Sequence, residues 1–372
     1  MTDLISEAKP KLTVVLGQPD VYSTSFQTRN LAAALSPWFQ PQFCSVPSRK
    51  TKFWRSFSRM MSNFIRPFFT RPRTEYLLYC NDGVADLKHW SGTRIIYWYD
   101  APEDWSERPP KRSNWVQRLR YENIRRAEHV LAVSATQVRV ARALRPGRED
   151  SVAYLPVGVD CRIFDPARGD AGRIRARYAL PGKPIVGYLG YLGAMHGRFA
   201  GEILLDAATE ILKRHDAHFL IVGFGPALDA WKERVAQLNL SAHVTFTGYV
   251  QDEDVPHCIA TMDVCVDTLE EGFHSEARSE TKLKQYMAMG RACVATAIGE
   301  NCADLDGGKC GVLVKPGAAL LAEAISGLLQ DEERRNALGR AARERALACY
   351  DWPVLAERFV RAIGLKSEPP GE

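Results

Sequence analysis

The chain has 372 residues, of which 46% are hydrophobic and 25% charged, and its formal net charge is +5 at pH 7. This length gives room for two domains of about 100–200 residues each, and the composition is that of an ordinary soluble globular protein. The sequence has no apolar run of the roughly 18 residues needed to span a bilayer, and its N-terminus lacks the features of a secretion signal.

Buried strands alternate with helices in the first half of the chain. The expected strands are 11–17, 75–80, 94–99 and 129–134, and the expected helices are 25–35, 114–127 and 135–144. Strands that are separated by helices predict a parallel sheet covered on both faces.

The second half repeats this rhythm. The expected strands are 185–189, 218–222, 243–247, 264–267, 291–296 and 311–314, and the expected helices are 200–214, 227–238, 281–290 and a long region from 317 to about 348. A segment rich in Asp, Arg, Gly and Pro, 160–183, is the expected linker. The predicted fold class is therefore α/β, with two Rossmann-like domains facing across a cleft and ligands bound at the carboxyl ends of the strands.

The predicted domains are 1–165 and 166–350. A final segment, 351–372, contains a helix over 352–363 that we expect to cross back to the first domain.

One basic segment, 49–73, has eight lysines and arginines and no acidic residue. On a helix its aromatic and aliphatic residues share one broad face, and Lys52, Arg55, Arg59 and Arg66 gather on the opposite face. This pattern is typical of a helix that lies on an anionic membrane surface. The alternatives are a stripe that packs on the neighbouring sheet beneath solvated arginines, and a nucleic-acid site, for which no motif is present.

Nine cysteines are scattered without paired spacing, mostly in apolar contexts. We expect them to be reduced core residues of a cytosolic protein. No Cys/His spacing typical of a metal site is present.

The segment Ser279–Thr296 is the most informative part of the chain. Lys282 and Lys284 fall in the first turn of its expected helix, and Arg278 precedes them. A helix N-terminus already has partial positive charge, so cations there are unfavourable unless an anion binds. Free backbone N–H groups and lysines together indicate a phosphate site. A solvated basic turn is the alternative.

The second half resembles the donor-binding domain of the GT-B glycosyltransferases, specifically the GT4 group. The matching pieces occur in family order. They are LPVGVD (155–160), VGYLG (186–190), IVGFGP (221–226), VTFTGYV (244–250), MDV (262–264), KLKQYMAMGRACVAT (282–296) and the segment 311–317. The first half resembles the family loosely, through YDAPEDW (99–105) and the later Glu122, Arg126–Val130 and Ser134.

This resemblance implies a nucleotide-sugar donor, stabilisation of the departing diphosphate by cations and backbone N–H groups, and no divalent metal. Gly223, Gly225, Tyr249 and Val250 would line the nucleotide pocket, together with Gly248. An ordinary strand-to-helix turn is the alternative for the two glycines.

The loop 190–198 departs from the family pattern, because Tyr191 stands where an arginine is usual. Gly193 and His196 of this loop are predicted to bind the donor, and Arg198 and Lys282 to contact its diphosphate. Lys284 and Arg278 are weaker candidates for the same role. Two lysines spaced two residues apart point different ways on a helix, so we expect only one to face the ligand.

Gln285 stands where the family has a glutamate that binds the ribose hydroxyls, and an amide still hydrogen-bonds a diol. The first motif glutamate would fall at Ala277, and Glu276 beside it is a candidate for the sugar. In the first domain, Asp100 and Glu103 are candidates to orient or deprotonate the acceptor hydroxyl, although a helix cap or turn carboxylate explains them equally well.

The predicted function is transfer of a hexose-like sugar from a nucleotide diphosphate to a lipid-linked or polysaccharide acceptor, with retention implied by the resemblance alone. The protein is expected to be cytoplasmic and peripheral to the inner membrane face, with no cofactor and no nucleic-acid partner. The alternatives are a non-catalytic partner subunit of the same fold and a nucleotide-sugar epimerase.

Overall fold

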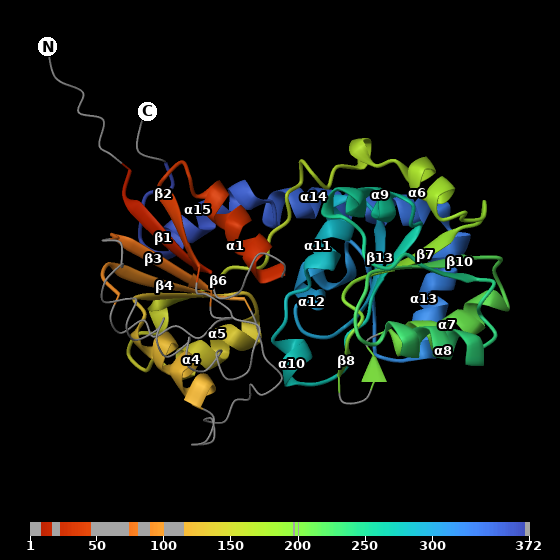
Figure 1. Ribbon diagram of the computed structural model, residues 1–372, viewed down its shortest axis with the longest axis horizontal. Helices are drawn as coiled ribbons and strands as arrows, with labels where there is room; N and C mark the ends of the chain where they lie inside the picture. Colours follow the sequence, from red (N-terminus) through yellow and green to blue (C-terminus); the bar gives the residue numbers. More distant parts are fainter. Residues whose placement is uncertain are drawn as a thin grey trace, which may run out of the picture. The chain divides into compact units, whose positions relative to one another are not determined.

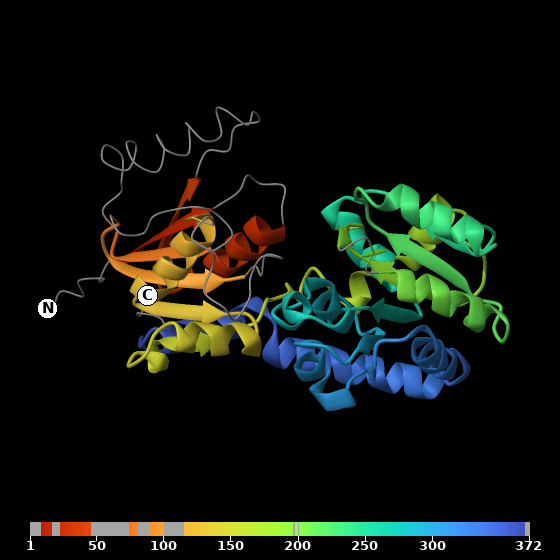
Figure 2. The same ribbon diagram turned by 90° about the horizontal axis from the view of Figure 1, so that it is seen from below.

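The computed structural model describes residues 9–16, 23–45, 74–80, 90–99, 115–195, 198–199 and 201–368. These residues divide into two compact units, each with its own parallel sheet. The first unit comprises 1–158, 277–279 and 352–372, and the second comprises 159–276 and 280–351. Helices cover both faces of each sheet (Figures 1 and 2).

The first unit has a six-stranded parallel sheet in the order β2-β1-β3-β4-β5-β6. Its strands are β1 (Lys11–Leu16), β2 (Gln40–Ser45), β3 (Tyr76–Cys80), β4 (Thr93–Trp98), β5 (His129–Ala132) and β6 (Val152–Tyr154). Its helices among the described residues are α1 (Ser23–Ala34), α4 (Trp115–Arg126), α5 (Ala135–Ala143), the 3-10 turn η2 (Glu149–Ser151) and the C-terminal α15 (Trp352–Ala362).

The C-terminal helix α15 belongs to the core of this first unit. Trp352, Leu355 and Phe359 are buried in one apolar cluster with residues of α1 and of the sheet. Gly158 fits beneath the helix because a Cβ there would lie 2.8 Å from the Trp352 and Leu355 side chains. The last helix therefore returns to the unit in which the chain began.

Strand β2 was not predicted from the sequence. Its residues QPQFCS include a proline and alternate weakly, and within the described part of the chain the strand pairs with β1 alone, at the edge of the sheet. Proline is tolerated at an edge because its missing N–H interrupts no central ladder.

The second unit has a six-stranded parallel sheet in the order β11-β10-β7-β12-β13-β14. Its strands are β7 (Ile185–Leu189), β10 (His218–Val222), β11 (Val244–Phe246), β12 (Val264–Asp267), β13 (Ala292–Thr296) and β14 (Val312–Val314), and β8 (Ala194–Met195) pairs with β9 (Arg198–Phe199) in a small antiparallel ribbon. The chain runs outward from β7 to β11 and then restarts at β12 on the other side of β7. The gap between β7 and β12 is therefore the topological switch point, where α/β sheets bind ligands.

Two groups of helices cover this sheet (Figure 1). One face packs against α7 (Glu202–Leu212), α8 (Leu228–Gln237) and α13 (Ala318–Gln330). The other face packs against α6 (Ala171–Arg177), α9 (Val255–Ala260), α11 (Thr281–Ala288) and α14 (Glu332–Cys349). Shorter turns complete the unit: η3 (Pro166–Arg168), η4 (Asp252–Asp254), α10 (Phe273–Glu276), α12 (Asn301–Asp304) and η5 (Asp306–Gly308).

Two differences from the sequence prediction have local causes. The long region expected from 317 to 348 is two helices, since Asp331 leaves the helical conformation and accepts the Arg334 N–H as the N-cap of α14. The expected linker contains helix α6, which Asp170 caps in the same way and which buries Ile174.

Candidate functional site

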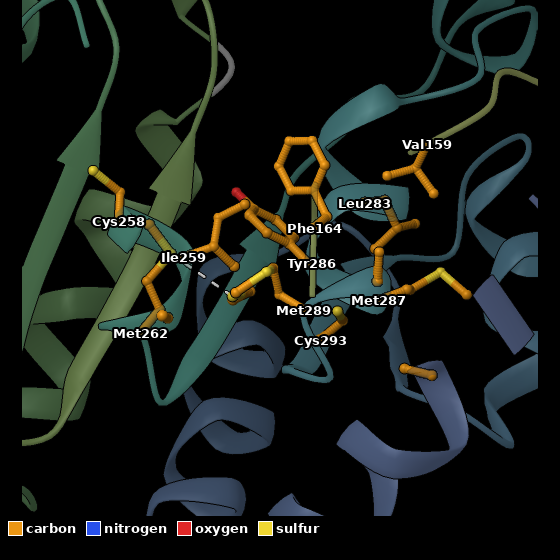
Figure 3. Packing of buried hydrophobic residues seen from close by; sticks show 14 of the residues in the cluster. Val159, Phe164, Cys258, Ile259, Met262, Leu283, Tyr286, Met287, Met289 and Cys293 are labelled. Carbon is orange, nitrogen blue, oxygen red and sulfur yellow. Dashed lines mark hydrogen bonds between the residues drawn. The ribbon is translucent and has the colours of Figure 1, made fainter. Parts of the chain in front are cut away.

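Helix α11 begins at the carboxyl edge of the second sheet, and its apolar side fixes it there. Leu283, Tyr286 and Met287 are fully buried in the cluster drawn in Figure 3. The Tyr286 hydroxyl accepts a hydrogen bond of 2.7 Å from the backbone N–H of Leu189, the last residue of β7. The helix ends as predicted, at Gly290 with φ of +62°. Tyr286 thus ties α11 to the switch-point strand.

The two lysines of the first turn have different surroundings, as the helical spacing predicts. Lys284 is fully buried and forms an ion pair with Asp304, which is also fully buried. Its ammonium lies over the Tyr350 ring, 5.4 Å from the ring centroid. Lys284 is therefore part of the core and is not accessible to a phosphate.

Lys282 lies on the other side of the helix, and its side chain is 12% exposed. Its Nζ is 2.9 Å from Asp267 Oδ1, 3.6 Å from Glu280 Oε2 and 4.7 Å from the centroid of the Tyr188 ring. Burial by itself lowers the pKa of Lys282, but the charge of Asp267, with smaller contributions from Tyr188 and Glu280, raises the pKa above its usual value. The ammonium is therefore protonated at any physiological pH.

Asp267 is the buried last residue of β12, so the Lys282–Asp267 pair lies where β12 ends beside β7. Gln285 lies one helical turn beyond Lys282 on the same partly exposed side of α11. The structure therefore brings Lys282 and Gln285 together at the switch point. The sequence analysis did not identify the residues around the Lys282 ammonium, Asp267, Glu280 and Tyr188. For Asp267 a signal was available, because a carboxylate ends the apolar strand VCVD.

The two predicted glycines after β10 are required by the protein's own backbone. Gly223 has φ of +139°, and a Cβ there would lie 1.9 Å from the Gly190 carbonyl oxygen. A Cβ on Gly225 would lie 2.3 Å from the Leu192 carbonyl oxygen. The loops after β7 and β10 thus touch directly, which explains both glycines without a ligand and leaves their contact with a nucleotide as a prediction.

Three exposed aromatic residues lie in these loops and in the neighbouring loop after β11. Tyr191, Phe224 and Tyr249 follow β7, β10 and β11, and 66%, 47% and 55% of their surfaces are exposed. The Phe224 ring packs edge-on against Tyr191, with centroids 5.9 Å apart, and against Tyr249, with centroids 5.2 Å apart. We call these residues the aromatic trio. Of its members, only Tyr249 was predicted as a site residue.

The remaining predicted site residues lie in several different elements and loops. Gly193 lies against the Tyr191 side chain, from which a Cβ on Gly193 would be 3.3 Å away, and the side chain of Val250 is buried in the core. Glu276 is exposed at the end of α10, and the loop after β13 approaches it, since a Cβ on Gly299 would lie 3.0 Å from the Glu276 Cα. Arg198 lies in β9. Asp100, Glu103, His196 and the basic segment 49–73 lie outside the described residues.

Two further features concern the part of the chain that the structure describes. In that part, no cluster of three His, Cys, Asp or Glu side chains is arranged to hold a metal ion. No helix in it combines the length and apolar character needed to cross a membrane.

Solved structures share this architecture over nearly the whole chain. The HepE protein of Anabaena, solved in complex with UDP and glucose, has a TM-score of 0.73 and 15% identity, over 95% of this chain and 99% of its own. A sucrose-phosphate synthase from Thermosynechococcus elongatus has a TM-score of 0.75 and 17% identity, over 95% and 98% of the two chains. The two units have the GT-B fold.

The sequence comparisons found a family match and several relatives. Residues 184–331 match the model of the family "Glycosyl transferases group 1". A GDP-mannose-dependent phosphatidylinositol monomannoside mannosyltransferase of Mycobacterium tuberculosis is 32% identical over 61% of this chain and 58% of its own length. An alpha-D-kanosaminyltransferase of Streptomyces kanamyceticus is 27% identical over 68% and 64%. The matches thus span about three fifths of these relatives. The match to the group 1 glycosyltransferase family therefore lies within the second unit.

Proposed function

We propose that this protein transfers a sugar from a nucleotide diphosphate donor to an acceptor hydroxyl, with the donor bound by the second unit. The observation that carries the proposal is Lys282, whose ammonium pairs with Asp267 at the N-terminus of α11 and at the switch point of the sheet. Fixed cations and helix N-termini stabilise the charge that develops on a departing diphosphate. The group 1 family domain supports the same reaction class.

The rest of the nucleotide has complementary surfaces at the same edge. Gln285 lies one turn beyond Lys282 and offers an amide to the ribose hydroxyls. The aromatic trio offers exposed rings of the kind on which nucleic-acid bases stack. Glu276, His196 and Arg198 are further proposed contacts to the sugar and phosphates, and Asp100 and Glu103 are proposed to act on the acceptor.

The acceptor is proposed to be lipid-linked or a polysaccharide. The support is the basic amphipathic pattern of 49–73 and a relative whose name specifies a phosphatidylinositol mannoside acceptor. Flotation with vesicles of neutral lipid, with and without anionic lipid, tests the membrane contact. Equal flotation with both vesicle types would contradict it.

A variant of Lys282 tests the phosphate assignment. Lys282→Met keeps the length of the side chain and removes its charge, so we expect turnover of the active donor, found in a panel of GDP-, UDP- and dTDP-sugars, to fall about 100-fold. Lys284→Met is the matched control, because it also removes the lysine partner of a buried aspartate, two residues away in the same helix. We expect Lys284→Met to lower the melting temperature without weakening nucleotide binding. Full turnover by folded Lys282→Met would contradict the proposal.

A further inference from the structure

The three loops that contain the aromatic trio are joined to one another through their backbones. The Leu192 N–H donates to the Phe224 carbonyl at 2.9 Å, and the Ala227 N–H donates to the Leu192 carbonyl at the same distance. Gly223 and Gly248 form an antiparallel bridge, which links the loop after β10 to the loop after β11. The aromatic trio is therefore part of one cross-linked backbone.

Phe224 is the central ring of the trio, because it contacts both tyrosines. The Tyr191 and Tyr249 rings lie at 88° and 78° to the Phe224 ring, in the edge-on geometry that aromatic pairs prefer. Within the described residues, neither tyrosine ring contacts any other aromatic ring. Removal of the Phe224 ring would thus leave both tyrosines without their aromatic neighbour.

The loops around the trio offer ring faces and no charged side chain. The segments 190–195, 223–228 and 247–251 contain no Asp, Glu, Lys or Arg. The three rings are also well exposed, at 66%, 47% and 55%. Such a surface suits the flat face of a ring system, and nucleobases stack on aromatic side chains in this way because every base has a π-face.

The trio lies close to the proposed diphosphate site. The Tyr188 hydroxyl oxygen is 3.5 Å from Lys282 Nζ, and a Cβ on Gly190 would lie 3.5 Å from the same oxygen. The Lys282 ammonium is therefore near the loop that contains Tyr191. A nucleotide whose diphosphate contacts Lys282 has its base within reach of these loops.

We propose that Phe224 is a positioning residue that holds Tyr191 and Tyr249 as a preformed stacking surface for the nucleobase of the donor. The inference rests on the proposed function, in which a nucleoside diphosphate binds at this edge of the sheet. The cross-linked backbone and the central ring restrict both tyrosine side chains before the ligand arrives, so less conformational entropy is lost on binding. Lys282 then binds the diphosphate, and the two tyrosines bind the base.

The experiment measures dissociation constants of GDP, UDP and ADP by calorimetry for the full chain, and continues with the nucleotide that binds most tightly. We expect Phe224→Leu, which keeps an apolar side chain and removes the ring, to weaken this binding about tenfold. Phe224→Tyr keeps the ring and should stay within about twofold of the original affinity. Phe43→Leu is the matched control, because Phe43 is 46% exposed against 47% for Phe224 and lies in β2 of the first unit. Its dissociation constant should not change, and an equal weakening there would contradict the inference.

Replacement of the tyrosines shows whether Phe224 acts through them. Tyr191→Leu and Tyr249→Leu should each weaken binding, and Phe224→Leu should add less than about twofold once both tyrosines are replaced. A full tenfold loss in that background would mean that Phe224 contacts the base itself, which would overturn the positioning role. The loss caused by Phe224→Leu should also be the same at low and high salt, because ions screen charges but not stacking.

The Lys282→Met variant separates failure of this inference from failure of the proposed function. If Lys282→Met and Phe224→Leu both leave the affinity unchanged, or if no nucleotide binds, both proposals fall. If Lys282→Met weakens binding and Phe224→Leu does not, only the stacking inference is overturned. Weakening by Phe224→Leu alone would support the stacking surface and contradict the Lys282 assignment. Should Phe224→Leu fail to fold, unchanged affinity in Tyr191→Leu, at the most exposed ring of the trio, overturns the inference.

Discussion

At the scale of single residues, the two lysines of α11 show how a spacing of two residues places one side chain at the sheet edge and the other in the core. Lys282 and Lys284 are chemically identical and nearly adjacent, yet one is partly exposed at the sheet edge and the other is sealed in the core. The helical rotation of about 100° per residue accounts for the difference. The sequence analysis predicted that only one would face a ligand, but not that each would have its own aspartate.

Gly223 and Gly248 provide a residue-scale prediction about the loops of the candidate site. Both have positive φ, but a Cβ on Gly223 would meet a backbone carbonyl at 1.9 Å, whereas a Cβ on Gly248 would meet nothing within 4 Å. We expect Gly223→Ala to lose about 3 kcal/mol of stability, because overpacking adds to the backbone penalty. Gly248→Ala should lose only about 1 kcal/mol, from its left-handed backbone alone. Urea denaturation of both variants measures this difference, and equal losses would contradict it.

At the scale of elements, α15 is the clearest case of an element whose role depends on distant sequence. Phe359 is fully buried with α1 and the first sheet, while Glu357 on the same helix forms an exposed ion pair with Arg361. We expect Phe359→Ala to cost about 3–5 kcal/mol through the cavity that it leaves.

The control for this prediction is Glu357→Ala, which removes only an exposed ion pair and should cost less than about 1 kcal/mol. Thermal unfolding of both variants, followed by circular dichroism, makes the comparison. A loss of similar size in the two variants would mean that α15 is not held by its apolar side.

At the scale of the whole molecule, the described residues form separate apolar clusters in the two units. Units with their own cores unfold as separate cooperative transitions when the coupling between them is weak. We therefore expect scanning calorimetry to resolve two transitions, with Phe359→Ala lowering only the one that belongs to the first unit.

A nucleoside diphosphate should raise the midpoint temperature of only the transition that belongs to the second unit, because a ligand stabilises the unit that binds it. A nucleotide at about 100 times its dissociation constant adds about 2.7 kcal/mol to that unit. A single transition, shifted equally by Phe359→Ala and by the nucleotide, would contradict both assignments. The units would then not have independent cores, and the donor could not be assigned to the second unit.

The sequence by itself determined most of the architecture, because buried parallel strands are short apolar runs and amphipathic helices repeat at a regular spacing. All six strands of the second sheet lie where they were predicted, within a few residues, and so do α11 and its closing glycine. The ordered motifs also predicted the family whose model matches residues 184–331. Strand β2 was missed since an edge strand, which pairs on one side only, need not be apolar or free of proline.

Only the tertiary structure determined which charged residues form ion pairs. Asp267 and Lys282 are 15 positions apart, and Lys284 and Asp304 are 20 apart, so no local pattern pairs them. Each pair depends on strands and helices that the fold brings together. Burial then distinguishes the two pairs, because neither side chain of Lys284–Asp304 is exposed, whereas the Lys282 side chain keeps 12% of its surface exposed.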